Sequence, residues 1–263
     1  MSKNIDCKES ILLSKKPLPR SKTPCKILKT TPPLTKIQIE RDKIFSLLAF
    51  AVAEKRWQSS NEKFIGHNIA AILVDKNDKI VCWGRNTTGI TNDATQHAET
   101  RLIRNFLQQS KFSKFLKHRI YVTFEPCVMC AGMIAFTGIE SVIYGQEAGP
   151  SGGVFERLNF DSREIGGYCP YWYHTESRKA PVEIGDKLVP LYEMLRERTY
   201  KNKLEIESKV HDVFIEAKQT LLNFKPTHIE NVKVLNQAIS FLDKVPAKYS
   251  TIPYTAACDI PNT

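Results

Sequence analysis

Hydrophobic residues follow two different spacings along this chain. From Lys36 to about Trp57 they return every three or four positions, which predicts an amphipathic helix. Two short apolar runs, residues 68–75 and 79–84, stand on either side of the turn-forming residues KND and predict a β-hairpin. After a polar loop, residues 97–109 return to helical spacing and predict a second helix with one apolar face.

Strands and helices continue to alternate further along. RIYVTFE (119–125) is rich in β-branched and aromatic residues, which favours a strand. CVMCAGMIAF (127–136) is apolar nearly all round, which predicts a buried helix, and SVIYG (141–145) predicts another strand. This alternation predicts an α/β fold with a mixed sheet that carries helices on its faces.

The second half of the chain is mainly helical by pattern. Residues 181–185 (PVEIG) are predicted as an edge strand, and residues 190–200 as a helix with Pro190 at its first position. Residues 203–224 and 229–245 are two further amphipathic helices. They form either a helical hairpin packed on the body or a small separate appendage.

Charge divides the chain into unequal parts. Residues 1–38 hold nine Lys or Arg and two acidic residues, whereas the other 225 hold 29 basic and 26 acidic residues. Residues 1–35 are also rich in proline, which predicts a disordered basic tail. The expected organisation is this tail, a domain at 36–200, and a helical extension with a loose tail at 201–263. A basic tail suits a polyanion such as nucleic acid, and a solubilising leader is an equal alternative.

The composition argues against several classes of protein, namely membrane, secreted and disulfide-rich proteins. No apolar run approaches the ~20 residues that span a bilayer, so no membrane association is expected. The N-terminus carries no secretory signal pattern, and cytoplasmic localisation is expected. The seven cysteines are odd in number and scattered, which favours reduced thiols and leaves metal binding or catalysis for the one close pair, Cys127 and Cys130.

Four residues form the candidate chemistry. His97 starts one predicted helix, and Cys127 and Cys130 start another directly after a strand. Cys-x-x-Cys at a helix start places both sulfurs near one face, so one His and two Cys can hold one ion. Three protein ligands and an open position are typical of catalytic zinc, which makes bound water acidic. Glu99, two residues from a ligand, would then carry protons. Chance assembly and structural zinc are the alternatives.

These residues carry a family resemblance. HAE (97–99) followed by PCVMC (126–130) matches the known H-x-E and P-C-x-x-C signature of zinc deaminases. Over residues 38–200 the chain resembles the zinc-dependent nucleobase, nucleoside and nucleotide deaminases. The resemblance implies a three-layer α/β/α sandwich around a five-stranded mixed sheet, as in cytidine deaminases, with one Zn²⁺ per chain on His97, Cys127 and Cys130. It also implies that Glu99 is the catalytic proton carrier.

The substrate is less sharply defined. YVTFEPCVMCAG (121–132) is similar to the tRNA adenosine deaminase branch, in which an asparagine at the position of Asn86 contacts substrate. By the same resemblance, Ala98 contributes a backbone group to the base. The loop TNDATQHAE (91–99) also resembles guanine and cytosine deaminases, and residues 166–184 depart from the tRNA enzymes. The expected activity is hydrolytic conversion of adenosine to inosine in tRNA. The alternatives are deamination of a free base or nucleoside, and a non-catalytic RNA-binding or partner subunit.

Two further expectations concern surfaces. A homodimer is implied by the family resemblance alone. The aromatic residues Tyr168, Tyr171, Trp172 and Tyr173 form either a lid that stacks on a flipped base or an ordinary packed loop, the packed loop being the more frequent outcome.

Overall fold

The computed structural model of the chain describes residues 33–110, 117–167, 169–171, 173–196 and 203–246. Most of the predicted basic tail and the final residues of the chain therefore lie outside the described residues. Within the described part, no helix is long and apolar enough to cross a membrane.

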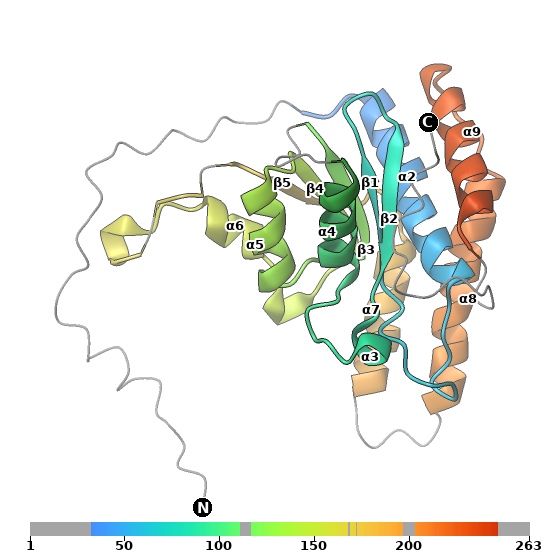
Figure 1. Ribbon diagram of the computed structural model, residues 1–263. Helices are drawn as coiled ribbons and strands as arrows, with labels where there is room; N and C mark the ends of the chain where they lie inside the picture. The colour runs from blue at the N-terminus through green and yellow to red at the C-terminus, as the bar shows by residue number, and fades with distance from the viewer. Residues whose placement is uncertain (1–32, 111–116, 168, 172, 197–202, 247–263) are drawn as a thin grey trace, which may run out of the picture.

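A mixed five-stranded sheet forms the centre of the molecule (Figure 1), as predicted. The strands lie in the order β2-β1-β3-β4-β5. Their bounds are β1 Ala70–Val74, β2 Ile80–Arg85, β3 Arg119–Phe124, β4 Ser141–Gln146 and β5 Glu176–Lys179. The predicted hairpin is confirmed, because β1 pairs antiparallel with β2. β1 also pairs antiparallel with β3, whereas β3, β4 and β5 run parallel to one another.

Strand β1 divides the hydrophobic core into two halves. All five of its residues are buried, which explains why its sequence is a continuous apolar run without polar alternation. Ile72 and Val74 pack into the cluster on the face covered by α2 (Lys36–Lys55), whereas Ala71 and Leu73 pack into the cluster under α4 (Ala98–Ser110) and α5 (Val128–Thr137). Helices therefore cover both faces of this central strand.

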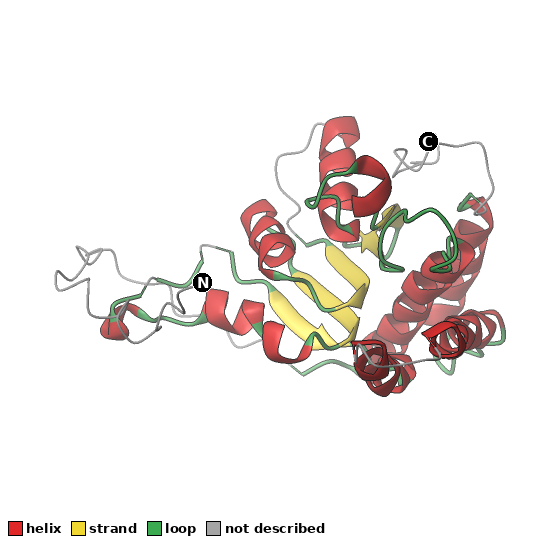
Figure 2. Cartoon of the chain, turned by 90° about the horizontal axis from the view of Figure 1, so that it is seen from below, coloured by secondary structure: helices red, strands yellow, loops and turns green. Residues whose placement is uncertain are grey.

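The helices form layers on the two faces of the sheet (Figures 1 and 2). Helices α4 and α5 cover one face, and α2 and α7 cover the other. Helices α8 and α9 pack on the outer side of α2. The bounds are α2 Lys36–Lys55, α3 Thr88–Thr91, α4 Ala98–Ser110, α5 Val128–Thr137, α6 Val154–Asn159, α7 Ile184–Arg196, α8 Lys203–Leu222 and α9 Glu230–Lys244.

Helix α2 is buried on two sides, which corrects the prediction of an amphipathic helix. It begins with a capping box, in which Thr35 and Gln38 each bond the other's backbone N–H through a side-chain oxygen. Every side chain from Ile44 to Ala53 is buried. The sheet covers one side of this segment, and the C-terminal helices cover the other. The C-terminal hairpin is thus packed on the body and adds a fourth layer.

Polar contacts at both ends of α2 fasten this outer layer. The carboxylate of Glu40 accepts hydrogen bonds from Thr227, at 2.6 Å from its hydroxyl, and from the Asn231 amide at 2.7 Å. Burial by itself raises the pKa of Glu40, but these hydrogen bonds outweigh it and lower the pKa to about 2. At the other end, the Lys55 ammonium donates to the carbonyl of Leu242 at 2.7 Å. That cation lies at the C-terminus of α9, where the helix dipole favours it.

A buried polar cluster joins α2 to the sheet. Asp42 is 1% exposed, and its carboxylate accepts from the Tyr121 hydroxyl of β3 at 2.6 Å. Its other oxygen accepts from the Arg178 guanidinium of β5 at 2.8 Å. Because both carboxylate oxygens are bonded, the buried charge has partners on two strands that are not neighbours.

The edge of the sheet differs from the prediction. Residues 181–185 do not form the edge strand; β5 lies just before them and is the charged segment ESRK. Helix α7 already begins at Ile184, so Pro190 stands inside the helix and not at its first position. A proline there removes one backbone N–H from the helical ladder. The last residues of the predicted helix, 197–200, lie outside the described residues.

Helix α5 is only partly buried, which corrects the prediction of a wholly buried helix. Cys130, Ile134 and neighbouring small residues face the core. Val128 is 73% exposed and Phe136 is 70% exposed. The all-apolar sequence therefore includes two side chains that nothing covers in the described part of one chain.

The segment between α6 and β5 extends away from the sheet (Figure 2). It includes the short 3-10 helix Arg163–Ile165. Of the aromatic residues predicted as a lid or a packed loop, Tyr168 and Trp172 lie outside the described residues. The Tyr171 backbone N–H donates to Leu158 at 2.9 Å, so this part of the segment is bonded to the end of α6.

Candidate metal and catalytic site

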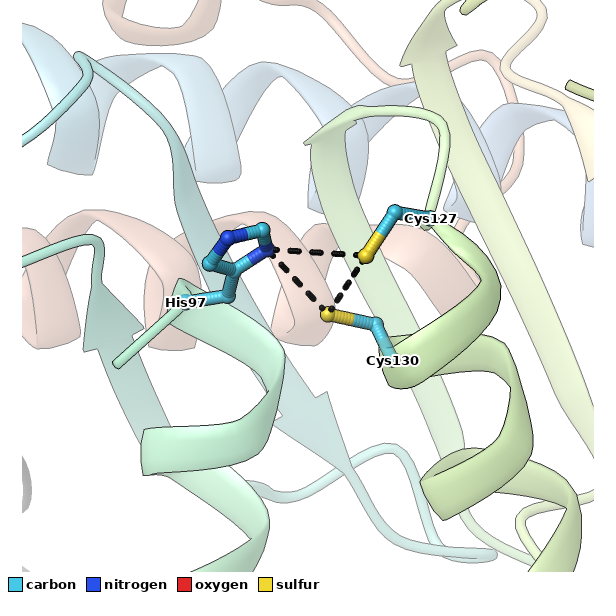
Figure 3. A group of neighbouring side chains, drawn as sticks. All are labelled: His97, Cys127 and Cys130. Carbon is cyan, nitrogen blue, oxygen red and sulfur yellow. Dashed lines mark hydrogen bonds between the residues drawn. The ribbon is translucent and has the colours of Figure 1, made fainter. Parts of the chain in front are cut away.

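His97, Cys127 and Cys130 converge at the starts of two neighbouring helices (Figure 3). His97 directly precedes α4, and Cys127 is the N-cap of α5, with Cys130 in its first turn. His97 Nδ1 lies 3.7 Å from Cys127 Sγ and 3.5 Å from Cys130 Sγ, and the two sulfurs are 3.7 Å apart. The convergence predicted from the two helix starts is confirmed in the geometry.

A glycine in β2 permits this approach of the helices. A Cβ added to Gly84 would stand 2.4 Å from the carbonyl oxygen of Ala98, the first residue of α4. The absent side chain therefore lets the start of α4 lie directly on the strand. Ala98 itself is fully buried, which fixes the backbone between His97 and Glu99.

The three side chains fit a zinc ion in number, chemistry and spacing. Zinc prefers thiolate and imidazole ligands in tetrahedral geometry, with Zn–S bonds of ~2.3 Å and Zn–N bonds of ~2.0 Å. Such bonds place neighbouring ligand atoms about 3.5 to 3.8 Å apart. The three separations here, 3.5 to 3.7 Å, have that size. Among the described residues, no other such group of three or more metal-binding side chains occurs.

The protonation state of Cys127 is also suited to binding a cation. Hydrogen bonds from Cys130 and then His97 lower the pKa of Cys127 to about 3. The hydrogen bond with Cys127 raises the pKa of Cys130, and so does burial, so Cys130 keeps its proton until a cation displaces it. Cys127 is thus a thiolate at neutral pH before any ion binds, and a thiolate is the form that coordinates metal.

Glu99 is buried beside the three ligand candidates, and it is less exposed than His97 and Cys127. It is 3% exposed, in the first turn of α4, and its carboxyl interacts with Cys130. Burial raises the pKa of Glu99 to about 7, although the charge of His97 opposes that rise. A buried carboxyl beside the candidate ligands is placed to hold a proton there, and it is not part of the converging trio.

Asn86 is buried directly after β2, and its side chain already has partners. The Asn86 amide oxygen accepts from the Thr88 N–H at 3.2 Å and from the Thr88 hydroxyl at 3.0 Å. These bonds make the turn that starts α3, which is the ordinary role of asparagine at such a position. The expected contact of Asn86 with substrate remains a prediction, as does that of the Ala98 backbone.

Glu125, just before Cys127, bonds backbone groups of the following loop. Its two carboxylate oxygens accept from the N–H groups of Ala148, at 2.8 Å, and Gly153, at 2.7 Å. It therefore fastens the loop after β4 beside the cysteine pair.

Sequence reasoning missed two residues that approach the site from another segment. Phe64 and His67 precede β1, and their rings meet edge to face with centroids 5.7 Å apart. Partial burial, followed by the charges of His97 and Arg85, lowers the pKa of His67. No sequence motif marks these residues. The chain before β1 is bonded to α3 through the carbonyl of Ile65, and this brings His67 near enough to His97 for their charges to interact.

Comparison with known proteins supports the assignment of a zinc site. Residues 40–146 match the family model of the cytidine and deoxycytidylate deaminase zinc-binding region. The chain is 34% identical over 92 residues to a tRNA-specific adenosine deaminase of Haemophilus influenzae, covering 35% of this chain and 53% of that protein. It is 32% identical over 106 residues to the enzyme of that name from Rickettsia felis, covering 40% of this chain and 74% of that protein.

Two further matches are a protein named for another substrate and a solved structure. A probable cytosine deaminase of Schizosaccharomyces pombe is 35% identical over 79 residues, covering 30% of this chain and 47% of that protein. A solved structure from a study of A-to-I editing by tRNA:A34 deaminases is 27% identical, covers 51% of this chain and 96% of that one, and has a TM-score of 0.39. The chain spans about half the length of the first relative and three quarters of the second.

A central mixed sheet with one His and two Cys at adjoining helix starts defines a zinc-binding α/β domain. This chain belongs to the cytidine and deoxycytidylate deaminase family of zinc-binding proteins.

Proposed function

We propose that the protein is a hydrolytic deaminase that converts adenosine to inosine in tRNA. The converging side chains of His97, Cys127 and Cys130, with the buried Glu99 beside them, carry the assignment of the reaction. The substrate rests on similarity to tRNA-specific adenosine deaminases and on the net charge of +10, which favours a polyanion.

In this proposal the side chains of the site divide the work. His97, Cys127 and Cys130 would hold zinc, which would supply a Lewis acid that makes water a nucleophile at neutral pH. Glu99 accepts a proton from the attacking water and passes it to the ring nitrogen, and it then carries the proton of the new hydroxyl group on the ring carbon to the leaving amine. Ammonia leaves and an oxygen takes its place. Asn86 and the backbone of Ala98 orient the base.

A second candidate substrate is a small free base or nucleoside. The similarity to a probable cytosine deaminase favours it, since cytosine is a free base. The reaction and the roles of the four residues are the same for both candidates. Cytoplasmic localisation is part of either proposal, and cell fractionation tests it.

The experiment combines zinc content with product formation. The purified protein should contain one zinc per chain, and it should form inosine in tRNA with release of ammonia. Removal of zinc by a chelator should abolish turnover, and added zinc should restore it. A parallel panel of adenosine, cytosine and guanine measures ammonia release. Activity on the panel with none on tRNA would select the second candidate; zinc-loaded protein inactive on everything would reject both.

We also propose that two copies of the chain associate, as expected from the family resemblance. Val128 and Phe136 are the exposed apolar side chains on α5 that a second copy would cover. Light scattering should then give twice the 30.0 kDa mass of one chain. Phe136→Glu should reduce the mass to that of one chain, because it places a charge in the contact. A single-chain mass for the unaltered protein would overturn this proposal.

A further inference from the structure

Two aromatic side chains stand exposed at the end of the segment that leads into β1. Phe64 is 54% exposed, and its ring meets the exposed His67 ring edge to face at an angle of 76°. Ile90 of α3 is also exposed, and its backbone N–H donates to the carbonyl of Ile65 at 3.0 Å, so α3 is bonded to the residue that follows Phe64. The result is a small aromatic step that faces solvent.

The backbone below this step is firmly held. The side-chain oxygen of Gln58, a buried residue, accepts from the N–H groups of Ile65 at 2.8 Å and Gly66 at 3.3 Å. The carbonyl of Ile65 in turn accepts from Gly89 at 2.9 Å as well as from Ile90. Rings mounted on such a loop are pre-organised, so binding costs little ordering entropy.

The step lies next to the reaction site. A Cβ on Gly66 would stand 2.4 Å from the Asn86 amide oxygen, and Gly66 has a φ of 156°. From there, the N–H of Thr87 donates to Gln96 at 3.0 Å, and Gln96 directly precedes His97. The influence of His97 on the pKa of His67 agrees with this closeness.

We propose that Phe64 and His67 stack on the base that neighbours the reacting nucleotide in a single-stranded nucleic acid. The inference rests on the proposed function and sharpens it, because it makes an unpaired strand the substrate class. Aromatic rings that stack unpaired bases are the usual means by which proteins hold single strands.

The exposure of the two rings and the positive charge of the protein favour a single-stranded nucleic acid over a free base as the ligand. A free base is bound whole by the site around Asn86 and His97 and leaves the step unused. A strand continues past the site, and its next base meets the exposed rings. The exposed cation Lys63 precedes Phe64 and can meet a backbone phosphate, in keeping with the net charge of +10.

The test compares two substrates with the same reacting base. Steady-state kinetics of the zinc-loaded protein are measured on an RNA stem-loop with the base unpaired in its loop, and on the corresponding free nucleoside. Phe64→Ala and His67→Ala should each raise the ratio of the RNA KM to the nucleoside KM by about 5- to 150-fold, the range measured for one base stacked on one aromatic ring. Phe64→Trp should restore the ratio.

A matched control is available at Phe160, which is 61% exposed and follows α6. Phe160→Ala removes an equally exposed ring and should leave the ratio unchanged. An unchanged ratio in both Phe64→Ala and His67→Ala would overturn the inference. An equal rise in both KM values would also overturn it, because the rings would then contact the reacting base.

A second measurement separates this inference from the proposed function. Fluorescence anisotropy reports binding of a labelled single-stranded RNA without any turnover. Phe64→Ala should weaken that binding by a similar factor, and circular dichroism should confirm that the variant is folded. If the unaltered protein deaminates nothing but Phe64→Ala still weakens binding, the proposed function fails and the stacking role stands. If RNA binding is unchanged, the stacking role fails.

Discussion

Replacing Glu99 by alanine is expected to lower kcat by about 10²- to 10⁴-fold while one zinc per chain stays bound. General acid–base catalysis by one positioned side chain is worth about that factor. Metal content should persist because the three converging ligands are His97, Cys127 and Cys130, and Glu99 is not among them. Ammonia release on the substrate found in the screen and metal analysis of the same sample measure both effects.

Two variants complete this experiment. Glu99→Gln keeps the shape of the side chain but cannot accept a proton, so it should lose as much activity as alanine. Glu140→Ala removes an exposed carboxylate on the turn before β4 and should retain full activity. If the Glu99→Ala protein kept most of the kcat of the unaltered protein, a group other than Glu99 would transfer the proton. If it lost turnover while the protein kept its biological role, the chain would act as an RNA-binding or partner subunit.

The largest loss of stability is expected from Asp42→Ala. Its carboxylate bonds the Tyr121 hydroxyl and the Arg178 guanidinium, so the change leaves both without their buried acceptor. Breaking a buried, hydrogen-bonded charge pair costs about 3 kcal/mol in the free energy of unfolding. Urea denaturation followed by circular dichroism measures this value for the two proteins.

Asp161→Ala is the matched control, because Asp161 also pairs with an arginine but lies on the surface. The Asp161–Arg163 pair is 2.8 Å long with the aspartate side chain 40% exposed. Surface pairs of this kind contribute about 0 to 1 kcal/mol. Equal losses from the two variants would mean that burial of Asp42 contributes nothing extra.

The sequence predicts the site well because each part of it is local. His97 and Glu99 lie two residues apart, and Cys127 and Cys130 lie three apart, so each pair is positioned by one helix start. The two pairs come together in space if α4 and α5 begin side by side. Phe64 and His67 could not be found in this way, because their closeness to His97 depends on contacts between segments.

The fold shows the same division between local and distant effects. The hairpin and the central strands were predicted correctly, since apolar runs with turn residues between them determine both. Strand β5 was missed because its sequence, ESRK, is polar and its pairing comes from the parallel neighbour β4. The exposure of Val128 and Phe136 was missed because hydrophobicity shows which residues prefer burial, but not what covers them.

The two-sided burial of α2 has a consequence for how the chain folds during synthesis. The apolar segment from Ile44 to Ala53 is made before α8 and α9, which cover its outer side and begin about 150 and about 180 residues later. Until the ribosome has released them, a continuous apolar ridge stays open to water and to other nascent chains. Complete burial of α2 therefore waits for α8 and α9, and chaperone binding to the growing chain should concentrate on this ridge.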